Sequence, residues 1–294
     1  MVCTVYWVSM GIADFDFDYT TRVPEGELGR FVEALWYARG RIPYAREKIA
    51  PTGSTVAVFV LGDPILQTAA NGDGETLRAE RGFLIGPHDG PVINEPTGET
   101  YAVGIVSTPI GGEVLFGLRT AALRGRVFDL EPTWPAATTL RQALVDCDDG
   151  EPMLDVVEAH LVDHMHPAAP GLDRCELAVT LLEANPTRSI ASVATELGVS
   201  HGHLDRQFTR VVGLSPRMLA RLLRMRRLLS GIDVRGQVAW ADLAHELGWF
   251  DQAHLIRDFK RHTGVTPSQY IEAHRVNFDP DGAGEAAGFV PESQ

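Results

Sequence analysis

The sequence predicts a two-domain α+β protein, with a β-rich domain first and an all-α domain after it. Up to about residue 130, short apolar runs alternate with glycine and proline, which is typical of strands and turns. From Leu172 to Arg275 the chain reads instead as short helices separated by glycine or proline, and one helical pattern occurs there twice. At 294 residues the chain is long enough for two hydrophobic cores.

The predicted N-terminal domain covers residues 1–135 and is a small β barrel or sandwich. Its clearest strand lies within Ser54–Pro64, where an apolar run ends at a Gly-Asp-Pro turn. Residues 81–93 and 100–112 repeat this scheme of apolar runs closed by turns. Residues 26–40 are ambiguous, because their apolar spacing fits one face of a helix whereas their aromatic end also suits a strand.

A helical connector is expected over residues 136–171, because apolar residues recur there at helical spacing. Leu154, Val157 and Leu161 form one such stripe. The segment from His166 to Gly171 is the predicted linker. Residues 276–294 are rich in glycine and acidic, and we predict that they form a disordered tail.

The repeated pattern over residues 172–275 consists of two short helices joined by a tight turn. In the first copy, Ser189 is a suitable N-cap for one helix, and Gly198 ends that helix. Ser200 caps a second helix, in which Leu204 and Phe208 face inward. This pattern predicts a helix-turn-helix motif.

The second copy follows at an offset of 51 residues, which places Arg257 at the position of Arg206 and Phe259 at the position of Phe208. Each copy therefore carries an arginine on the solvent face of its second helix. Between the copies, residues 215–232 predict one long helix that acts as a rigid spacer.

Charge is distributed unevenly along the chain. The whole sequence carries a net charge of −13, yet residues 186–275 contain 13 basic and 8 acidic residues, and the rest contains 13 basic and 31 acidic residues. A basic region joined to an acidic one indicates a binding module for an anionic partner. The second helix of each copy, held apart from the other by a rigid spacer, is suited to enter the major groove. The two helices would then occupy successive major-groove segments on one face of DNA, about 34 Å apart.

The repeated motifs resemble those of the AraC/XylS family of bacterial transcription regulators. The matching positions of the first motif are Val193, Ala194, Leu197, Gly198, Ser200, Leu204, Phe208, Gly213, Ser215 and Pro216. Those of the second motif are Leu243, Ala244, Gly248, Phe250, Asp251, His254, Leu255, Arg257, Phe259, Lys260, Gly264, Thr266, Pro267, Ser268 and Tyr270. The resemblance covers residues 172–275, about a third of the chain, and implies a sequence-specific DNA-binding transcriptional regulator.

By position, the resemblance also implies which residues meet DNA. The base-contacting residues would be His201, Gly202, Asp205, Arg206, Gln252, Ala253, His254, Ile256 and Arg257. The phosphate-contacting residues would be Thr209, Arg210, Lys260 and Arg261. Arginine is the residue that most often reads guanine, Gln252 suits adenine, and Asp205 suits cytosine or orients Arg206. Gly202 departs from the bulky residues often found at its position, so the first motif is expected to read fewer bases.

Short stretches within residues 28–64 and 102–118 resemble the cupin-like sensor domain that precedes this DNA-binding module in many regulators. That resemblance implies ligand sensing or dimerisation. The expected partners are double-stranded promoter DNA, a small-molecule effector, a second copy of the chain and, for an activator, RNA polymerase, whereas no cofactor is expected. Trp7, Trp36 and Tyr44 are candidates for lining an effector pocket, although a place in the core is the commoner role of such residues.

Two other classes of protein stay open on the sequence. A cupin-type metalloenzyme needs two or three imidazoles and a carboxylate inside the barrel, whereas residues 1–135 contain only His88. His160 and His164 have a helical spacing that suits zinc, but no second pair of ligands is evident. No nucleophile elbow, P-loop or dinucleotide fingerprint occurs, so neither catalytic residues nor enzymatic activity nor a metal is predicted. The other class is a protein-interaction module with an acidic docking domain and degenerate DNA binding.

The expected location is the cytoplasm, at the nucleoid. The N-terminal stretch is apolar but lacks a basic region and a cleavage site, and no stretch reaches the roughly twenty apolar residues of a membrane helix. Cys3, Cys147 and Cys175 form no CxxC pair and fit a reducing compartment.

Overall fold

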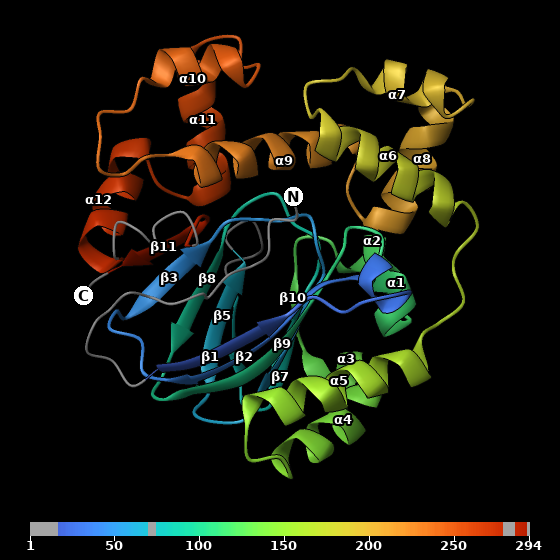
Figure 1. Ribbon diagram of the computed structural model, residues 1–294, viewed down its shortest axis with the longest axis vertical. Helices are drawn as coiled ribbons and strands as arrows, with labels where there is room; N and C mark the ends of the chain where they lie inside the picture. The colour runs from blue at the N-terminus through green and yellow to red at the C-terminus, as the bar shows by residue number, and fades with distance from the viewer. Residues whose placement is uncertain (1–16, 70–74, 279–285, 293–294) are drawn as a thin grey trace.

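The computed structural model describes residues 17–69, 75–278 and 286–292. In Figure 1, two β-sheets occupy the middle of the molecule, a short helical layer lies below them, and the C-terminal helices lie across the top. The β-rich N-terminal domain and the all-α C-terminal domain confirm the predicted fold class. No helix of the described part of the chain is long and apolar enough to cross a bilayer.

Both sheets of the N-terminal domain are antiparallel. The six-stranded sheet has the order β1 (Phe17–Arg22), β2 (Val32–Gly40), β9 (Thr100–Ser107), β4 (Val56–Val60), β7 (Gly82–Ile85) and β10 (Val127–Asp129). The five-stranded sheet has the order β11 (Phe289–Glu292), β3 (Arg46–Ile49), β8 (Val92–Pro96), β5 (Ile65–Ala69) and β6 (Thr76–Ala79). The predicted strands at 54–64, 81–93 and 100–112 contain β4, β7 with the start of β8, and β9.

The ambiguous segment at residues 26–40 is mostly a strand. A single 3₁₀ turn, Leu28–Arg30, precedes β2, and most residues of β2 are buried on both faces. β2 lies between β1 and β9, and the helix α5 (Gly150–His164) packs against it. Burial on both faces removes the alternation of polar and apolar residues that would have marked a strand in the sequence.

The predicted connector is helical and belongs to the N-terminal domain. The segment after β9 forms the short helices α1 (Gly112–Phe116), α2 (Thr120–Leu123) and α3 (Leu130–Thr133), followed by α4 (Ala136–Val145) and α5. Arg22 of β1 forms ion pairs with Asp155 and Glu158 of α5, at 2.6 and 3.4 Å. The connector is therefore fixed to the six-stranded sheet.

The all-α domain contains both predicted helix-turn-helix units. Its helices are α6 (Leu172–Ala184), α7 (Ile190–Glu196), α8 (His201–Val212), α9 (Pro216–Gly231), α10 (Trp240–Glu246), α11 (Gln252–Thr263) and α12 (Pro267–Asn277). The predicted spacer at residues 215–232 is α9, and Figure 1 shows the two units at its opposite ends.

Each helix-turn-helix unit shares its core with the N-terminal domain. One apolar cluster runs from Phe59 and Ile105 in the sheet to Leu204 and Phe208 in α8. A second cluster surrounds α10, α11 and α12 and includes Ala50 and Val290 from the β domain. The two parts of the chain therefore form one packed body.

The prediction of a disordered tail is wrong for Phe289–Glu292, which form strand β11 on the edge of β3. Phe289 and Val290 are buried, and Arg46 donates to Glu292 at 2.6 Å. Two apolar residues and one complementary charge in a glycine-rich, acidic segment are too few to reveal a strand from composition. Residues 279–285 and 293–294 lie outside the described residues.

Candidate nucleic-acid interface and effector cavity

The first helix-turn-helix unit is formed by α7 and α8. The Ser189 and Ser200 hydroxyls accept hydrogen bonds from the N–H groups of Ser192 and His203, at 3.1 and 3.3 Å, and so cap the two helices. Gly198 makes the turn between them with a φ of 69°, in the left-handed region that favours glycine. These local signals are the ones on which the prediction of the motif depended.

The second unit, formed by α10 and α11, uses different local contacts. The Asp251 carboxylate caps α11 by accepting from the His254 N–H at 2.6 Å. The turn is fixed by Trp249, whose indole N–H donates to buried Asp258 at 3.0 Å. The Arg224 guanidinium of α9 lies over the Trp249 ring, 4.4 Å from its centroid. Sequence reasoning missed this cluster, because its residues come from three separate segments.

The predicted base-contacting residues lie toward the N-terminal ends of α8 and α11. His201, Gly202 and Arg206 in α8 are exposed, as are Gln252, Ala253 and Arg257 in α11. Asp205, His254 and Ile256 are half-buried. Within the described residues, no hydrogen bond or ion pair occupies the Arg206 or Arg257 guanidinium. The N-terminal halves of both helices are therefore accessible.

The predicted phosphate-contacting residues have two kinds of environment. Lys260 is exposed and Thr209 is half-buried. Arg210 donates to the Pro170 carbonyl at 2.6 Å, and Arg261 donates to the Asp89 carboxylate at 2.6 Å. Arg261 must therefore exchange its partner in the β domain before it can reach a phosphate.

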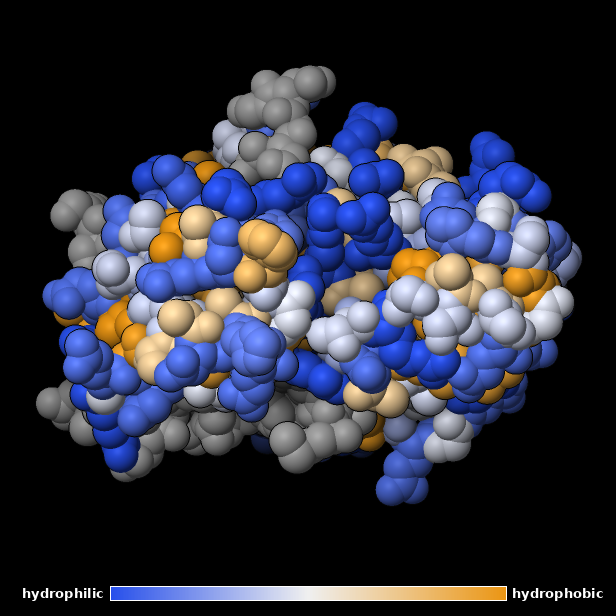
Figure 2. Space-filling model, turned by 90° about the horizontal axis from the view of Figure 1, so that it is seen from above, coloured by the Kyte–Doolittle hydropathy of each residue, from blue (hydrophilic) through white to orange (hydrophobic). Residues whose placement is uncertain are grey.

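The face of the molecule above α9 is largely hydrophilic and is hollowed between two lobes (Figure 2). α9 contributes the exposed Arg217 and Arg227 and the half-exposed Arg221, whereas Arg224 and Arg226 are mostly buried against Trp249 and Glu33. A surface of this kind suits a polyanion, because guanidinium groups form charge-assisted hydrogen bonds with phosphate.

The C-terminal ends of α8 and α11 both lie next to the segment Gly86–Pro91, which joins β7 to β8, and each end has one other close neighbour, Thr120 of α2 for α8 and Lys48 of β3 for α11. A Cβ placed on Gly213, which ends α8, would lie 3.1 Å from the Pro87 ring. A Cβ on Gly264, which ends α11, would lie 3.1 Å from the Pro91 ring. Equivalent glycines of the two units thus contact two prolines of one short segment.

Asp89 adds polar contacts between the same segment and α11. Besides the Arg261 ion pair, the Asp89 carbonyl accepts a hydrogen bond from Nδ1 of His262 at 2.7 Å. Burial lowers the pKa of His262, which favours the neutral ring. The Gly86–Pro91 segment is therefore held to α11 by one ionic and one neutral contact.

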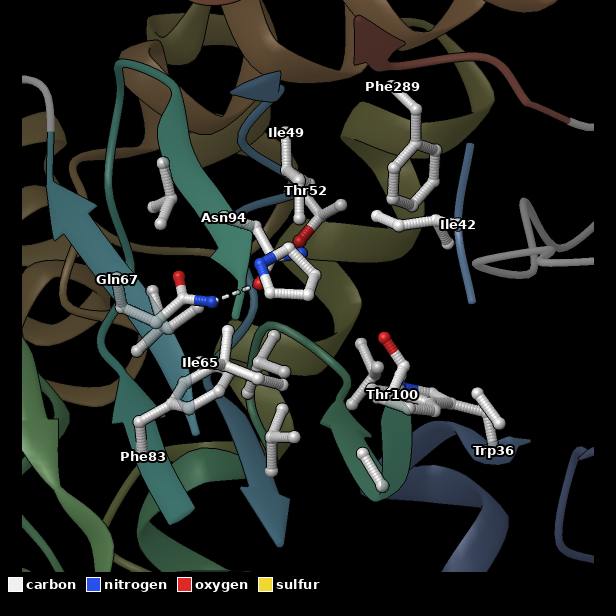
Figure 3. Close-up of a pocket in the computed structure, with 18 of the residues that line it drawn as sticks. Trp36, Ile42, Ile49, Thr52, Ile65, Gln67, Phe83, Asn94, Thr100 and Phe289 are labelled. Carbon is white, nitrogen blue, oxygen red and sulfur yellow. Dashed lines mark hydrogen bonds between the residues drawn. The ribbon is translucent and has the colours of Figure 1, made fainter. Parts of the chain in front are cut away.

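A cavity of about 100 Å³ lies between the two sheets of the N-terminal domain. Aliphatic and aromatic side chains from both sheets line it, among them Trp36, Ile65 and Phe83 (Figure 3). Of the three aromatic residues expected to be candidates, Trp36 lines the cavity, Tyr44 is buried outside it, and Trp7 lies outside the described residues. One water molecule needs roughly 10–15 Å³, so the cavity has room for a small molecule.

Three of the polar groups that line the cavity have hydrogen-bond partners that fix their orientation. Gln67 of β5 and Asn94 of β8 are joined by a hydrogen bond, drawn as a dashed line in Figure 3. His88, from the Gly86–Pro91 segment, also lines the cavity. Its Nδ1 lies 2.9 Å from the Gly86 carbonyl, and burial lowers the pKa of His88. One segment therefore contacts the cavity and both helix-turn-helix units.

The histidine pair at helical spacing lies on α5. His160 and His164 stack with ring centroids 4.1 Å apart, and His164 Nδ1 lies 2.8 Å from the His160 carbonyl. Among the described residues, no three His, Cys, Asp or Glu side chains are grouped closely enough to hold a metal ion. His164 is exposed, whereas His160 is half-buried and packs edge-on against the buried Trp134 ring, with 6.1 Å between the centroids.

Comparison with known proteins agrees with this architecture. Residues 174–273 match the family model of a helix-turn-helix domain, and residues 20–129 match a domain of unknown function. No curated protein matches the chain. The matched ranges follow the division between the all-α and the β-rich parts.

Among solved structures, ToxT from Vibrio cholerae is similar at a TM-score of 0.45 and 12% identity, covering 87% of this chain and 98% of its own. A probable AraC family transcriptional regulator from Rhodopseudomonas palustris is similar at a TM-score of 0.30 and 25% identity, covering 34% of this chain and 95% of its own. A transcriptional regulator from Chromobacterium violaceum with an AraC-type DNA-binding domain has a TM-score of 0.31 and 26% identity, covering 35% and 92%. With its two motifs and its family match, residues 174–273 are a helix-turn-helix domain, and the chain that carries it is a DNA-binding transcriptional regulator.

Proposed function

We propose that the protein reads promoter DNA with the N-terminal halves of α8 and α11, in two successive major-groove segments. The observation that supports this best is the exposure of both helix starts at the two ends of α9. α9 has 16 residues and is about 24 Å long, which suits a separation on the order of one DNA turn. In this proposal the base-contacting and phosphate-contacting residues are those that the sequence predicts, and the protein acts at the chromosome without catalysis.

We further propose that a small effector in the N-terminal cavity changes how α8 and α11 are presented. The support is the Gly86–Pro91 segment, which places His88 at the cavity and Pro87, Asp89 and Pro91 at the two units. A ligand that shifts this segment changes the contacts of both recognition helices at once. The size of its effect is limited by the difference between its affinities for the protein with the segment shifted and unshifted. A second copy of the chain and RNA polymerase are further partners in this proposal.

The reading of DNA is tested by Arg257→Ala, with Arg41→Ala as a matched control that removes an exposed arginine from the N-terminal domain. Because a bidentate arginine contributes about 1–3 kcal/mol of discrimination, the variant should lose specific affinity by that amount and lose preference at one base pair. Fluorescence anisotropy with the operator and with scrambled DNA measures both quantities. An equal loss of affinity for the operator and for scrambled DNA would show that Arg257 contacts only phosphate.

The alternative, a protein-interaction module without DNA binding, is tested by the same anisotropy measurement of DNA affinity. Affinity for any duplex DNA should fall steeply as salt rises from 50 to 200 mM, because phosphate binding releases counterions. A full chain that binds no duplex at the lower salt concentration would favour the interaction module.

A further inference from the structure

The chemistry of the cavity indicates which class of effector it accepts, and this inference rests on the proposed role of the cavity. Of the described residues that line it, none is a lysine, arginine, aspartate or glutamate. Transfer of an unpaired ion into such surroundings is strongly unfavourable. The cavity therefore disfavours a charged ligand.

One buried acceptor faces the cavity without a partner. Gln67 is 1% exposed, its Nε2 donates to Asn94 Oδ1, and its Oε1 has no hydrogen-bond partner among the described residues. An unpaired buried carbonyl oxygen is costly, and a ligand that donates to it removes that cost. Figure 3 shows this amide on the wall of the cavity, between β5 and β8.

The orientation of the Gln67 amide is determined by a chain of hydrogen bonds. Glu47 is fully buried and accepts from Tyr44 Oη at 2.8 Å and from Asn94 Nδ2 at 2.9 Å. In its ionised form, which prevails above its pKa of about 7, Glu47 only accepts, so the amide nitrogen of Asn94 faces Glu47 and Asn94 Oδ1 is left for Gln67 Nε2. Gln67 Oε1 is then necessarily the end of the chain that remains for a ligand.

Further polar atoms reach the cavity. His88 Nδ1 must carry the hydrogen, because the Gly86 carbonyl can only accept, and Nε2 of the neutral ring is therefore an acceptor. The Thr100 hydroxyl is buried without a partner among the described residues, and Figure 3 shows it pointing into the cavity. The wall thus offers two acceptors, Gln67 Oε1 and His88 Nε2, and the hydroxyls of Thr100 and Thr52 in an apolar surface. The Thr52 hydroxyl already accepts from the Ser54 N–H at 3.4 Å.

We propose that the effector is an uncharged, mainly apolar molecule with a hydroxyl or N–H group that donates to Gln67 Oε1. Its apolar body occupies the space among Trp36, Ile65 and Phe83. An alcohol, a phenol or an indole has this chemistry, whereas a carboxylate of the same size does not.

Three probes of similar size separate these classes, namely 1-octanol, methyl heptyl ether and octanoate, titrated into the full chain at pH 8 by calorimetry. 1-Octanol should bind about fivefold more tightly than the ether, which accepts but cannot donate, because a satisfied buried hydrogen bond is worth on the order of 1 kcal/mol. Octanoate should bind at least as weakly as the ether. Binding of octanoate as tight as that of 1-octanol, equal binding of the alcohol and the ether, or absence of binding by all three would overturn the proposal.

Gln67→Leu should abolish the preference for the alcohol over the ether. The matched control is Thr68→Val, which removes a hydroxyl from the same strand at a position that pairs with Thr76 outside the cavity. Thr68→Val should keep the preference, and an unchanged preference in Gln67→Leu would contradict the assignment. DNA binding measured separately distinguishes the two proposals, because an alcohol that binds as expected without altering DNA affinity would remove the regulatory role and leave the ligand class intact.

Discussion

At the scale of the residue, Glu47 is the side chain whose properties depend most on the fold. Burial raises its pKa to about 7, against the opposing effect of the hydrogen bonds from Tyr44 and Asn94. The sequence around it, Arg46–Ile49, looks like an ordinary charged edge strand. Its partners lie on the preceding loop and on β8, and no local pattern predicts that they meet.

The raised pKa makes stability depend on pH. Above pH 4.5 the unfolded chain releases this proton, whereas the folded chain keeps it up to about pH 7. The free energy of unfolding should therefore fall between these pH values, by on the order of 3 kcal/mol, and stay lower above them. Urea unfolding of the wild type and of Glu47→Gln at pH 5 and pH 8 measures this difference. Glu272→Gln, at an exposed position, is the control that should keep the wild-type dependence.

At the scale of the element, local signals predicted the helices better than the strands. The caps at Ser189 and Ser200 and the turn at Gly198 act over a few residues, so the sequence alone was enough to place α7 and α8. β2 and β11 depend on neighbours far along the chain, and so the first was ambiguous and the second was missed. The base-contacting residues stay predictions, since only DNA binding can test them.

Strand β11 joins α12 to β3, and its removal should loosen the second helix-turn-helix unit. His274 Nε2 donates to the Phe289 carbonyl at 2.8 Å, and Val290 lies in the core around α11. A chain that ends at Phe278 should unfold at a temperature several degrees lower, because it loses this core contact and exposes the edge of β3. Calorimetry of the full and shortened chains measures the shift. A control that removes only residues 293–294 should leave the midpoint unchanged.

At the scale of the whole molecule, the β domain and the helical domain are joined by contacts that the sequence did not predict. Arg226 of α9 forms a 2.8 Å ion pair with Glu33 of β2, and both side chains are largely buried. Arg261 of α11 is paired with Asp89. Net charge suggested an acidic part and a basic part, but only the folded chain shows which charges meet.

The Asp89–Arg261 pair should oppose DNA binding. Asp89→Asn releases the Arg261 guanidinium, which can then neutralise one more phosphate. The slope of log affinity against log salt should become steeper by about 0.9, and affinity should rise at low salt. Asp129→Asn, which removes an exposed carboxylate from the same domain, is the control for charge alone. Identical slopes for both variants would mean that Arg261 does not reach the backbone.

Support of both units by Gly86–Pro91 has a consequence for operator choice. Because this segment contacts both α8 and α11, a shift of it under the proposed mechanism would change the distance and the rotational phase between the two helices together. An effector would then change which spacing between half-sites is preferred, and not merely how tightly one operator is held. This is measured as the affinity, with and without effector, for operators whose half-sites are moved apart or together by single base pairs.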